Sequence, residues 1–160
     1  MDTKEVINTS LYSKEKTTTL LQNIFEDKGW EHECHENGDL IVTYQGEHFV
    51  IEVAHDGCHF RIWDWHWYSV STENLANFAM VRKAINECNA LINSTLIYSV
   101  NEEEHEMNLL TRKDIDWIPL ISDLKPYLQN VMDSMLTVHH YFFQVMENLR
   151  QEEYAKQNEN

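Results

Sequence analysis

The chain has 160 residues, of which 42% are hydrophobic, so it can bury one sizeable core. Its 12 basic and 27 acidic residues give a formal net charge of −15, which opposes binding to nucleic acid or to an anionic membrane surface. With only 4 glycines and 2 prolines, linkers are not expected, and we predict a single domain over residues 1–160 with an ordered core at about 13–150.

Targeting and redox signals are sparse. No secretory signal is visible at the start, and no apolar run approaches the roughly 18 residues that span a bilayer. The three cysteines, Cys34, Cys58 and Cys88, are an odd number at wide spacing, which is not a disulfide framework. We therefore expect a cytoplasmic protein with reduced thiols.

The first element after a weakly patterned stretch at 1–12 is a helix over 14–28. Ser13 is a suitable N-cap, and Gly29 can take the left-handed conformation that ends a helix. The apolar stripe of this helix consists of Leu20, Leu21, Ile24 and Phe25.

Four strands are predicted next, over 30–35, 40–44, 47–55 and 58–68. Short turns join them, and the dipeptides Asn37-Gly38, Gln45-Gly46 and Asp56-Gly57 supply the positive φ that tight hairpins need. Neighbouring strands should therefore pair antiparallel.

A second helix is predicted over 73–92, capped by Ser71-Thr72, with Cys88 on its apolar face. Strands over 95–100 and 105–111 follow. The turn between them, at 101–104, holds three consecutive glutamates and reads as a solvated loop.

The last predicted element is a long helix, with Pro119 and Pro126 near its start. Its apolar residues recur in alternating steps of four and three, at Leu124, Leu128, Val131, Met135, Val138, Phe142, Val145 and Leu149. Flanking apolar residues widen this seam, which favours packing on the protein's own sheet over pairing with a partner helix. The polar residues 151–160 are expected to fray.

Strands that come in runs, instead of alternating with helices, indicate the α+β class. The expected architecture is an antiparallel sheet, built from a meander and a hairpin, with helices packed mainly on one face. The element order is α-ββββ-α-ββ-α.

This layout resembles the YbjN-like proteins and the related class I type III secretion chaperones. The string Ile85-Asn86-Glu87-Cys88-Asn89 is similar to an N-x-x-N stretch of that group, and a strand, an acidic turn and a second strand follow it in the same way. The resemblance covers about 13–150 and implies an acidic, cytosolic, often homodimeric protein that binds polypeptides. It carries no catalytic residues over, implies a structural role for Asn86 and Asn89, and does not extend to the tryptophan-rich fourth strand.

The most unusual local sequence is the aromatic run in that fourth strand. Strand periodicity puts Trp63, Trp65 and Trp67 on one face and Phe60 and Ile62 on the other. A bulge near Trp63-Asp64 would shift this parity, whereas an unshifted strand on an uncovered face would leave an aromatic stripe exposed. Core packing or a dimer interface would bury the same residues.

Nine histidines raise the alternative of a small zinc-binding or hydrolytic protein, with His32, Cys34, Cys58 and His59 as the candidate residues. No C-x-x-C pair, nucleophile elbow or phosphate-binding glycine loop is present, and the one pair with H-x-x-x-H spacing, His55 and His59, flanks a predicted turn. His139, beside the seam of the last helix, could respond to pH or make a polar contact.

We therefore expect a non-enzymatic protein without cofactor or metal. Its expected partner is another polypeptide or a second copy in a homodimer, with no nucleic acid and no membrane. The residues expected to contact the partner are Trp63, Trp65 and Trp67.

Overall fold

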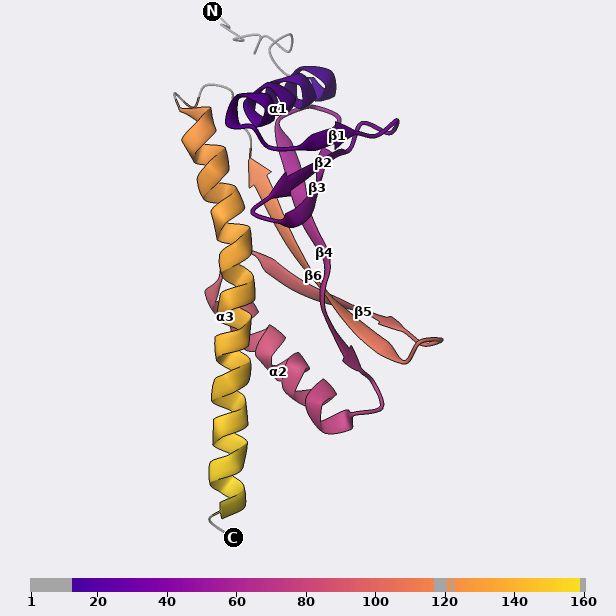
Figure 1. The fold of residues 1–160 in the computed structure, drawn as a ribbon, viewed down its shortest axis with the longest axis vertical. Helices are drawn as coiled ribbons and strands as arrows, with labels where there is room; N and C mark the ends of the chain where they lie inside the picture. The colour runs from indigo at the N-terminus through magenta and orange to yellow at the C-terminus, as the bar shows by residue number, and fades with distance from the viewer. Residues whose placement is uncertain (1–12, 117–120, 122, 159–160) are drawn as a thin grey trace, which may run out of the picture. The chain divides into compact units, whose positions relative to one another are not determined.

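The computed structural model describes residues 13–116, 121 and 123–158 (Figure 1). Its elements follow the predicted order and confirm the α+β class. They are α1 (Lys14–Lys28), β1 (His32–Cys34), β2 (Leu40–Tyr44), β3 (Glu47–Val53), β4 (His59–Ser71), α2 (Leu75–Leu91), β5 (Thr95–Asn101), β6 (Glu106–Asp116) and α3 (Leu124–Asn158).

The six strands form one sheet in the order β1-β2-β3-β4-β6-β5. β1, β2 and β3 pair antiparallel as the predicted meander requires, and β5 pairs antiparallel with β6 as the predicted hairpin requires. Because β6 and not β5 lies beside β4, the sheet has β1 at one edge and β5 at the other.

The described residues divide into two compact units. Unit 1 is drawn from Met1–Ile62 and Asp114–Lys125, and unit 2 from Trp63–Lys113 and Pro126–Asn160, so β4 and β6 contribute residues to both. That the whole chain acts as one domain stays a prediction.

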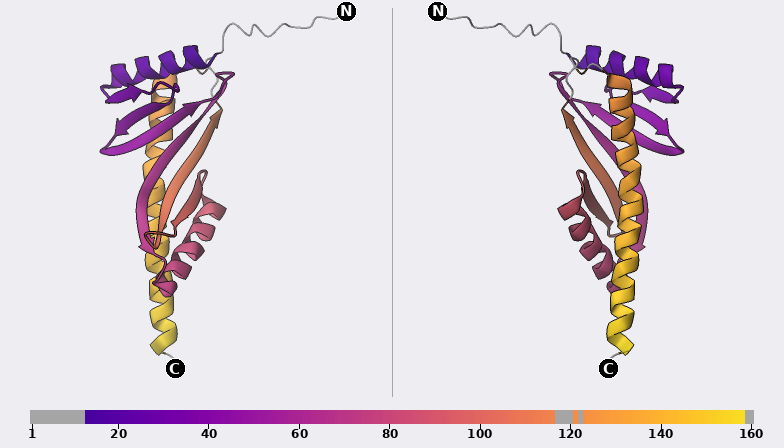
Figure 2. Two further views of the ribbon diagram at one scale, coloured as in Figure 1. Left: turned by 90° about the vertical axis from the view of Figure 1, so that its right-hand side faces the viewer. Right: turned by 90° about the vertical axis from the view of Figure 1, so that its left-hand side faces the viewer.

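Helix α1 of unit 1 has the predicted ends. The Ser13 hydroxyl accepts a hydrogen bond from the Lys16 amide at 3.2 Å, and Gly29 ends the helix at φ 70°. Leu21 and Phe25 on its inner face are fully buried with the inward residues of β2 and β3, and Figure 2 shows the helix lying along these strands.

Two glycine turns of unit 1 have different physical demands. Gln45 and Gly46, at φ 51° and 89°, both adopt the left-handed conformation, as a two-residue turn of the primed type requires. Gly57, at φ 72°, also lies against the start of α1. A Cβ there would overlap the backbone of Ser13, and the Thr17 hydroxyl donates to the Gly57 carbonyl at 2.7 Å. Gly57 is therefore a packing contact as well as a turn residue.

Unit 2 is built around one apolar cluster, to which α2, α3 and the strands β4, β5 and β6 all contribute. Cys88 and Phe142 are among its fully buried members, and Figure 2 shows α2 running beside β5. Ser71-Thr72 was expected to cap α2, but the cap is Asn74, whose side chain accepts from the Asn77 amide. Ser71 is instead the last residue of β4.

The apolar seam of α3 packs on the protein's own core, as its width predicts. Its buried residues are Leu128, Val131, Met132, Met135, Val138, Phe142, Val145, Met146 and Leu149. Pro126 lies in the first turn, whereas Pro119 falls outside the described residues. The expectation that 151–160 frays is wrong as far as Asn158, because this stretch is rich in strong helix formers.

Strands β4 and β6 are longer than expected. β6 continues through the polar residues after Thr111 because Ile115 is buried and Asp114 pairs with Arg61 at 2.6 Å. None of the helices in the described parts of the chain is long and apolar enough to cross a membrane.

Candidate polypeptide-binding surfaces

Strand β4 holds the tryptophans that the sequence singles out. Trp63 and Trp65 stack with ring centroids 4.9 Å apart and planes at 29°, and Trp65 is 47% exposed. Asp64, which lies between them in the chain, is only 2% exposed, so its side chain points to the interior. By strand alternation, Trp63 and Trp65 lie on the opposite, outer face of β4.

Trp67 does not lie on the outer face of β4, because the strand is distorted at His66. His66 has φ 54°, the left-handed region that non-glycine residues seldom occupy, and this interrupts the alternation. The Trp67 ring stacks on His139 of α3 at 4.2 Å, and its Nε1–H donates to the Thr111 hydroxyl at 3.0 Å. The expectation that all three tryptophans share one face is therefore wrong for Trp67, and the distortion lies at His66 and not near Trp63-Asp64.

Asp64 and His139 form a polar pair inside unit 2. The Asp64 Oδ2 atom lies 2.6 Å from His139 Nε2, and the side chains are 3% and 18% exposed. A buried carboxylate is costly without a partner, so His139 and the stacked Trp67 ring fix this part of α3 against β4. The expected polar contact of His139 is thus present, with a partner 75 residues away in the chain.

An aromatic cluster extends from this pair to the surface. Trp67 and Tyr68 both contact Phe142 and Phe143, with centroids 5.3 to 6.1 Å apart. Phe142 is fully buried, whereas Phe143 is 47% exposed. Phe143 is one of the flanking apolar residues that widen the α3 seam, and its exposure was not predicted from the sequence.

Edge strand β5 is the second candidate surface. Its seven residues, TLIYSVN, include no charge, no proline and no interruption of the register with β6. Natural edge strands are normally protected by charged residues, proline or a bulge, because their unpaired N–H and C=O groups can otherwise pair with another strand. Tyr98 and Val100 on this strand are also 38% and 45% exposed.

One side chain shows which backbone groups of β5 face outward. The Asn89 amide accepts from the Leu96 N–H at 2.8 Å and donates to the Leu96 C=O at 3.0 Å. It thereby makes the two bonds that a neighbouring strand would make. Because the pattern repeats every two residues, the N–H and C=O groups of Tyr98 and Val100 point to the same outer side. In the sheet of the described residues no strand lies there.

The expected structural role of the N-x-x-N stretch is thus realised at Asn89, which joins the end of α2 to the start of β5. Asn86, one turn earlier, is exposed. The sequence placed Asn89 near the end of the helix, but its contact with Leu96 required the tertiary structure.

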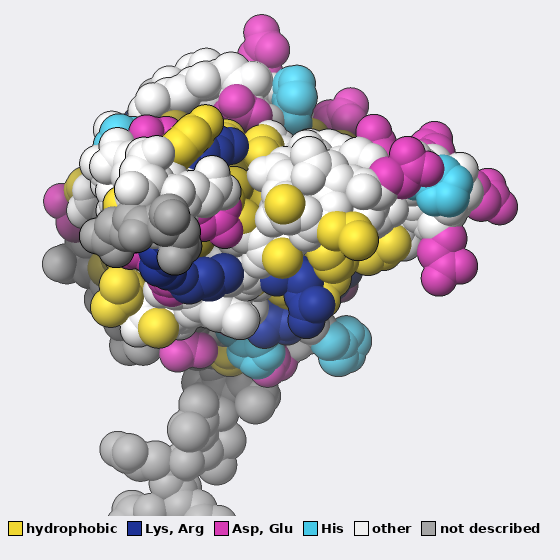
Figure 3. Space-filling view, turned by 90° about the horizontal axis from the view of Figure 1, so that it is seen from below, with side chains coloured by type: hydrophobic (Ala, Val, Ile, Leu, Met, Phe, Trp, Pro, Cys, Tyr) yellow, Lys and Arg dark blue, Asp and Glu magenta, His cyan; other side chains and the backbone are white. Residues whose placement is uncertain are grey.

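The turn that follows β5 is strongly acidic. Asn101 orders it, since its side-chain oxygen accepts from the Glu103 and Glu104 amides and its amide nitrogen donates to the Glu104 carboxylate. Acidic side chains gather at this hairpin tip (Figure 3). The open edge therefore ends beside a concentration of negative charge.

The four residues of the alternative metal site are not brought together. His32 and Cys34 lie on β1, whereas Cys58 and His59 lie at the start of β4, and two strands separate β1 from β4. Three strand spacings amount to about 14 Å, too far for shared coordination. Among residues 13–116, 121 and 123–158, no group of three or more His, Cys, Asp or Glu side chains could hold a metal ion.

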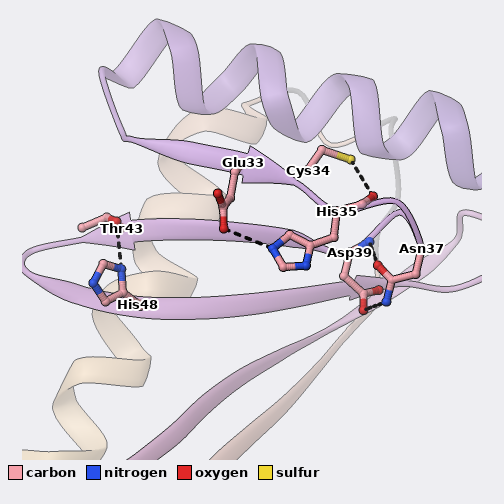
Figure 4. Close-up of polar contacts among 7 residues, drawn as sticks. All are labelled: Glu33, Cys34, His35, Asn37, Asp39, Thr43 and His48. Atoms are coloured by element: carbon pink, nitrogen blue, oxygen red, sulfur yellow. Dashed lines mark hydrogen bonds and ion pairs between the residues drawn. The ribbon is translucent and has the colours of Figure 1, made fainter.

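The polar residues around β1 bond locally. Figure 4 shows the exposed pair His35–Glu33, with 3.1 Å between nitrogen and oxygen, and the Asn37 side chain donating to the Asp39 carboxylate. The Cys34 thiol donates to a backbone carbonyl. Cys88 is buried as predicted, and burial raises the pKa of its thiol to about 11, with a smaller contribution from the adjacent Glu87 carboxylate. Neither thiol therefore has the setting of an activated nucleophile.

Comparisons with known proteins identify the fold but not a family. No protein-family model matches the chain, and no curated protein sequence matches it. Among solved structures, the chain is similar to E. coli YbjN, described there as a candidate transcription regulator, with a TM-score of 0.53 and 10% identity over 83% of this chain and 92% of that one. The chain has a YbjN-like fold. This likeness does not extend to the secretion-chaperone class.

Proposed function

We propose that the protein is a non-enzymatic polypeptide-binding protein that takes an extended segment of its partner as an added strand beside β5. The observation that carries this proposal is the outer side of β5, where Asn89 already occupies the position of a partner strand at Leu96. A bound segment would continue from that point along Tyr98 and Val100.

The chemistry of the edge indicates the kind of segment. Tyr98 and Val100 favour β-branched or aromatic residues at alternate positions of the partner, since such cross-strand pairs are the stabilising ones. The acidic turn at Glu102, Glu103 and Glu104 favours lysine or arginine at the end of the segment that lies beside it. A net charge of −15 opposes self-association, which makes a basic partner a better fit than a second copy.

The outer tryptophans form a separate contact. Trp63 and Trp65 remain candidate partner-contact residues, because aromatic side chains dominate binding hot spots and Trp65 is half exposed. Trp67 is not part of that surface, because its ring stacks on His139 of α3. If the protein acts in regulation, as the description of YbjN suggests for that protein, its charge directs it to a protein and not to DNA.

A photo-crosslinking experiment tests the proposal. A benzoylphenylalanine residue replaces Tyr98 in the native cell, and the same residue replaces Leu75, which is 74% exposed and lies on α2 instead of β5, as the matched control. We expect a discrete polypeptide adduct from position 98 that position 75 does not give. The proposal fails if both positions give the same adducts or if position 98 gives none.

A variant then distinguishes strand addition from side-chain contact. Val100→Pro removes an outward N–H, whereas Val100→Thr keeps the backbone and the β-branched shape. We expect proline to abolish the adduct and threonine to retain it. An adduct consisting of two copies of this chain would identify the partner as the protein itself and would overturn the basic-partner proposal.

A further inference from the structure

A hollow of about 520 Å³ lies in unit 2, between the end of α2 and one side of α3, and it belongs to neither of the surfaces described above. Ile92, Val138 and Tyr141 give it an apolar lining, Ser134 and Thr137 add hydroxyls, and Lys113 brings an amino group. Its volume is within the range of pockets that hold small molecules.

Lys113 differs from those basic residues of this acidic chain that pair with carboxylates. Lys83 and Lys125 pair with carboxylates, as Arg61 does. The Lys113 ammonium instead donates to the Asn93 carbonyl at 2.7 Å, and within the described residues it forms no ion pair with a carboxylate. Desolvation lowers the pKa of Lys113, so the surroundings disfavour its charged form.

The two α3 hydroxyls that line the hollow do not replace this cation as donors. The Ser134 hydroxyl donates to the Val131 carbonyl at 2.6 Å, and the Thr137 hydroxyl donates to the Asp133 carbonyl at 2.9 Å. Their protons are thus used within α3. Lys113 is the charged donor of the hollow, and Ile92, Val138 and Tyr141 are the part of the wall suited to apolar atoms.

We propose that this hollow binds a small amphipathic carboxylate, with the single carboxylate on the Lys113 ammonium and the apolar body against Ile92, Val138 and Tyr141. One cation matches one negative charge, and pairing with an anion would offset the desolvation of the ammonium. The net charge of −15 disfavours ligands with several negative charges, such as nucleotides.

Titration with octanoate, followed by amide NMR, tests this binding, with 1-octanol and octylammonium as probes of equal chain length. We expect octanoate to shift the amide resonances of residues 92–94 and 134–141. Octanol should bind about tenfold more weakly, since a charge-assisted hydrogen bond is lost, and octylammonium should not bind. Equal affinities for octanoate and octanol, or no shifts around the hollow, would overturn the proposal.

Two lysine variants locate the charge contact. Lys113→Gln should weaken octanoate binding about tenfold and leave octanol binding unchanged, which also shows that the hollow is intact. Lys83→Gln removes a lysine outside the hollow and should leave both affinities unchanged. If the two variants behave alike, the ammonium of Lys113 does not hold the carboxylate.

A third variant blocks the space. Thr137→Trp places a large ring at an exposed position of α3 and should abolish binding of octanoate and octanol alike. Unchanged octanoate binding in this variant would place the ligand elsewhere. Val100→Pro should bind octanoate as the native chain does, so failure of strand addition at β5 and failure of this pocket are separate results.

Discussion

The two units of the chain differ in where they put apolar and polar groups. All seven exposed large hydrophobic side chains of the described residues belong to unit 2, and none belongs to unit 1. They are Trp65, Leu75, Leu91, Tyr98, Val100, Phe143 and Tyr154. Unit 2 also buries a carboxylate, Asp64, whereas the buried polar residues of unit 1 are threonines. Unit 1 is thus a closed scaffold, and the features that suit binding gather in unit 2.

The two edge strands of the sheet show the same contrast between a protected surface and one suited to binding. β1 is three residues long, and the exposed carboxylate of Glu33 is hydrogen-bonded to the His35 that follows the strand, which discourages pairing with another strand. β5 is seven residues long and uncharged. Because both edges belong to one sheet, only the chemistry of the strands makes one edge protected and the other open.

The largest expected effect is on the stability of unit 1, at the contact between Gly57 and the backbone of Ser13. Gly57→Ala adds a Cβ that overlaps Ser13 at a positive φ, so we expect a loss of about 4 kcal/mol in the free energy of unfolding. Gly46→Ala is the control, because it has a positive φ but open space around it, and should cost about 1 kcal/mol. Urea unfolding followed by circular dichroism measures both. Equal losses would show that contact with Ser13 does not matter.

The next largest expected effect is the loss of stability when the buried Asp64–His139 pair of unit 2 is removed. His139→Ala leaves the Asp64 carboxylate buried without its partner and removes the ring that stacks on Trp67, so we expect a loss of about 3 kcal/mol. His35→Ala removes a histidine from an exposed pair in unit 1 and should cost about 0.5 kcal/mol. If thermal or urea unfolding gives similar losses for the two variants, the contrast between the units is wrong.

A smaller effect tests the cap on the open edge. Asn89→Ala removes two hydrogen bonds to Leu96, and we expect a loss of about 2 kcal/mol. Asn86→Ala, at the other asparagine of the same motif and one helical turn earlier, should lie within about 0.5 kcal/mol of the native chain. Hydrogen exchange at the Leu96 amide should accelerate in the first variant alone. An unchanged exchange rate would mean that Asn89 does not protect this edge.

The smallest effect concerns the thiols and needs no mutation. The pKa of Cys88 is raised from 9.0 to about 11, so its reactive thiolate is scarce at pH 8, whereas Cys34 is exposed. We expect iodoacetamide to modify Cys34 rapidly and Cys88 only on unfolding, as peptide mass spectrometry can show.

The same shift gives a stability change with a definite sign. Above pH 9.0 the unfolded chain loses the Cys88 proton while the folded chain keeps it up to about pH 11, so this group makes stability fall as the pH rises through that window. Cys88→Ala should flatten this part of the pH dependence. A native-state Cys88 as reactive as Cys34 would contradict the buried position.

Much of the fold could be predicted because its signals are local. The ends of α1 follow from the capping residues Ser13 and Gly29. The turn at Gln45-Gly46 follows from the glycine, which adopts the positive φ that the turn needs. The seam of α3 and the burial of Cys88 follow from helical periodicity. The candidate site was predictable only in part, since Trp63 and Trp65 lie on one face as strand alternation requires, but Trp67 does not.

Only the tertiary structure decided the contacts between residues that are far apart in the chain. The left-handed His66 turns Trp67 toward His139, and no local pattern marks a non-glycine residue for that conformation. The sequence predicted that β5 forms a hairpin with β6, but it did not show which of the two strands pairs with β4. In the structure β6 lies beside β4, and β5 is therefore the open edge. The sequence by itself thus determined the elements and their buried faces, because both follow from short-range geometry. The tertiary structure decided the open edge, the Asn89 cap and the contact of Lys113 with Asn93, because each depends on contacts between different segments of the chain.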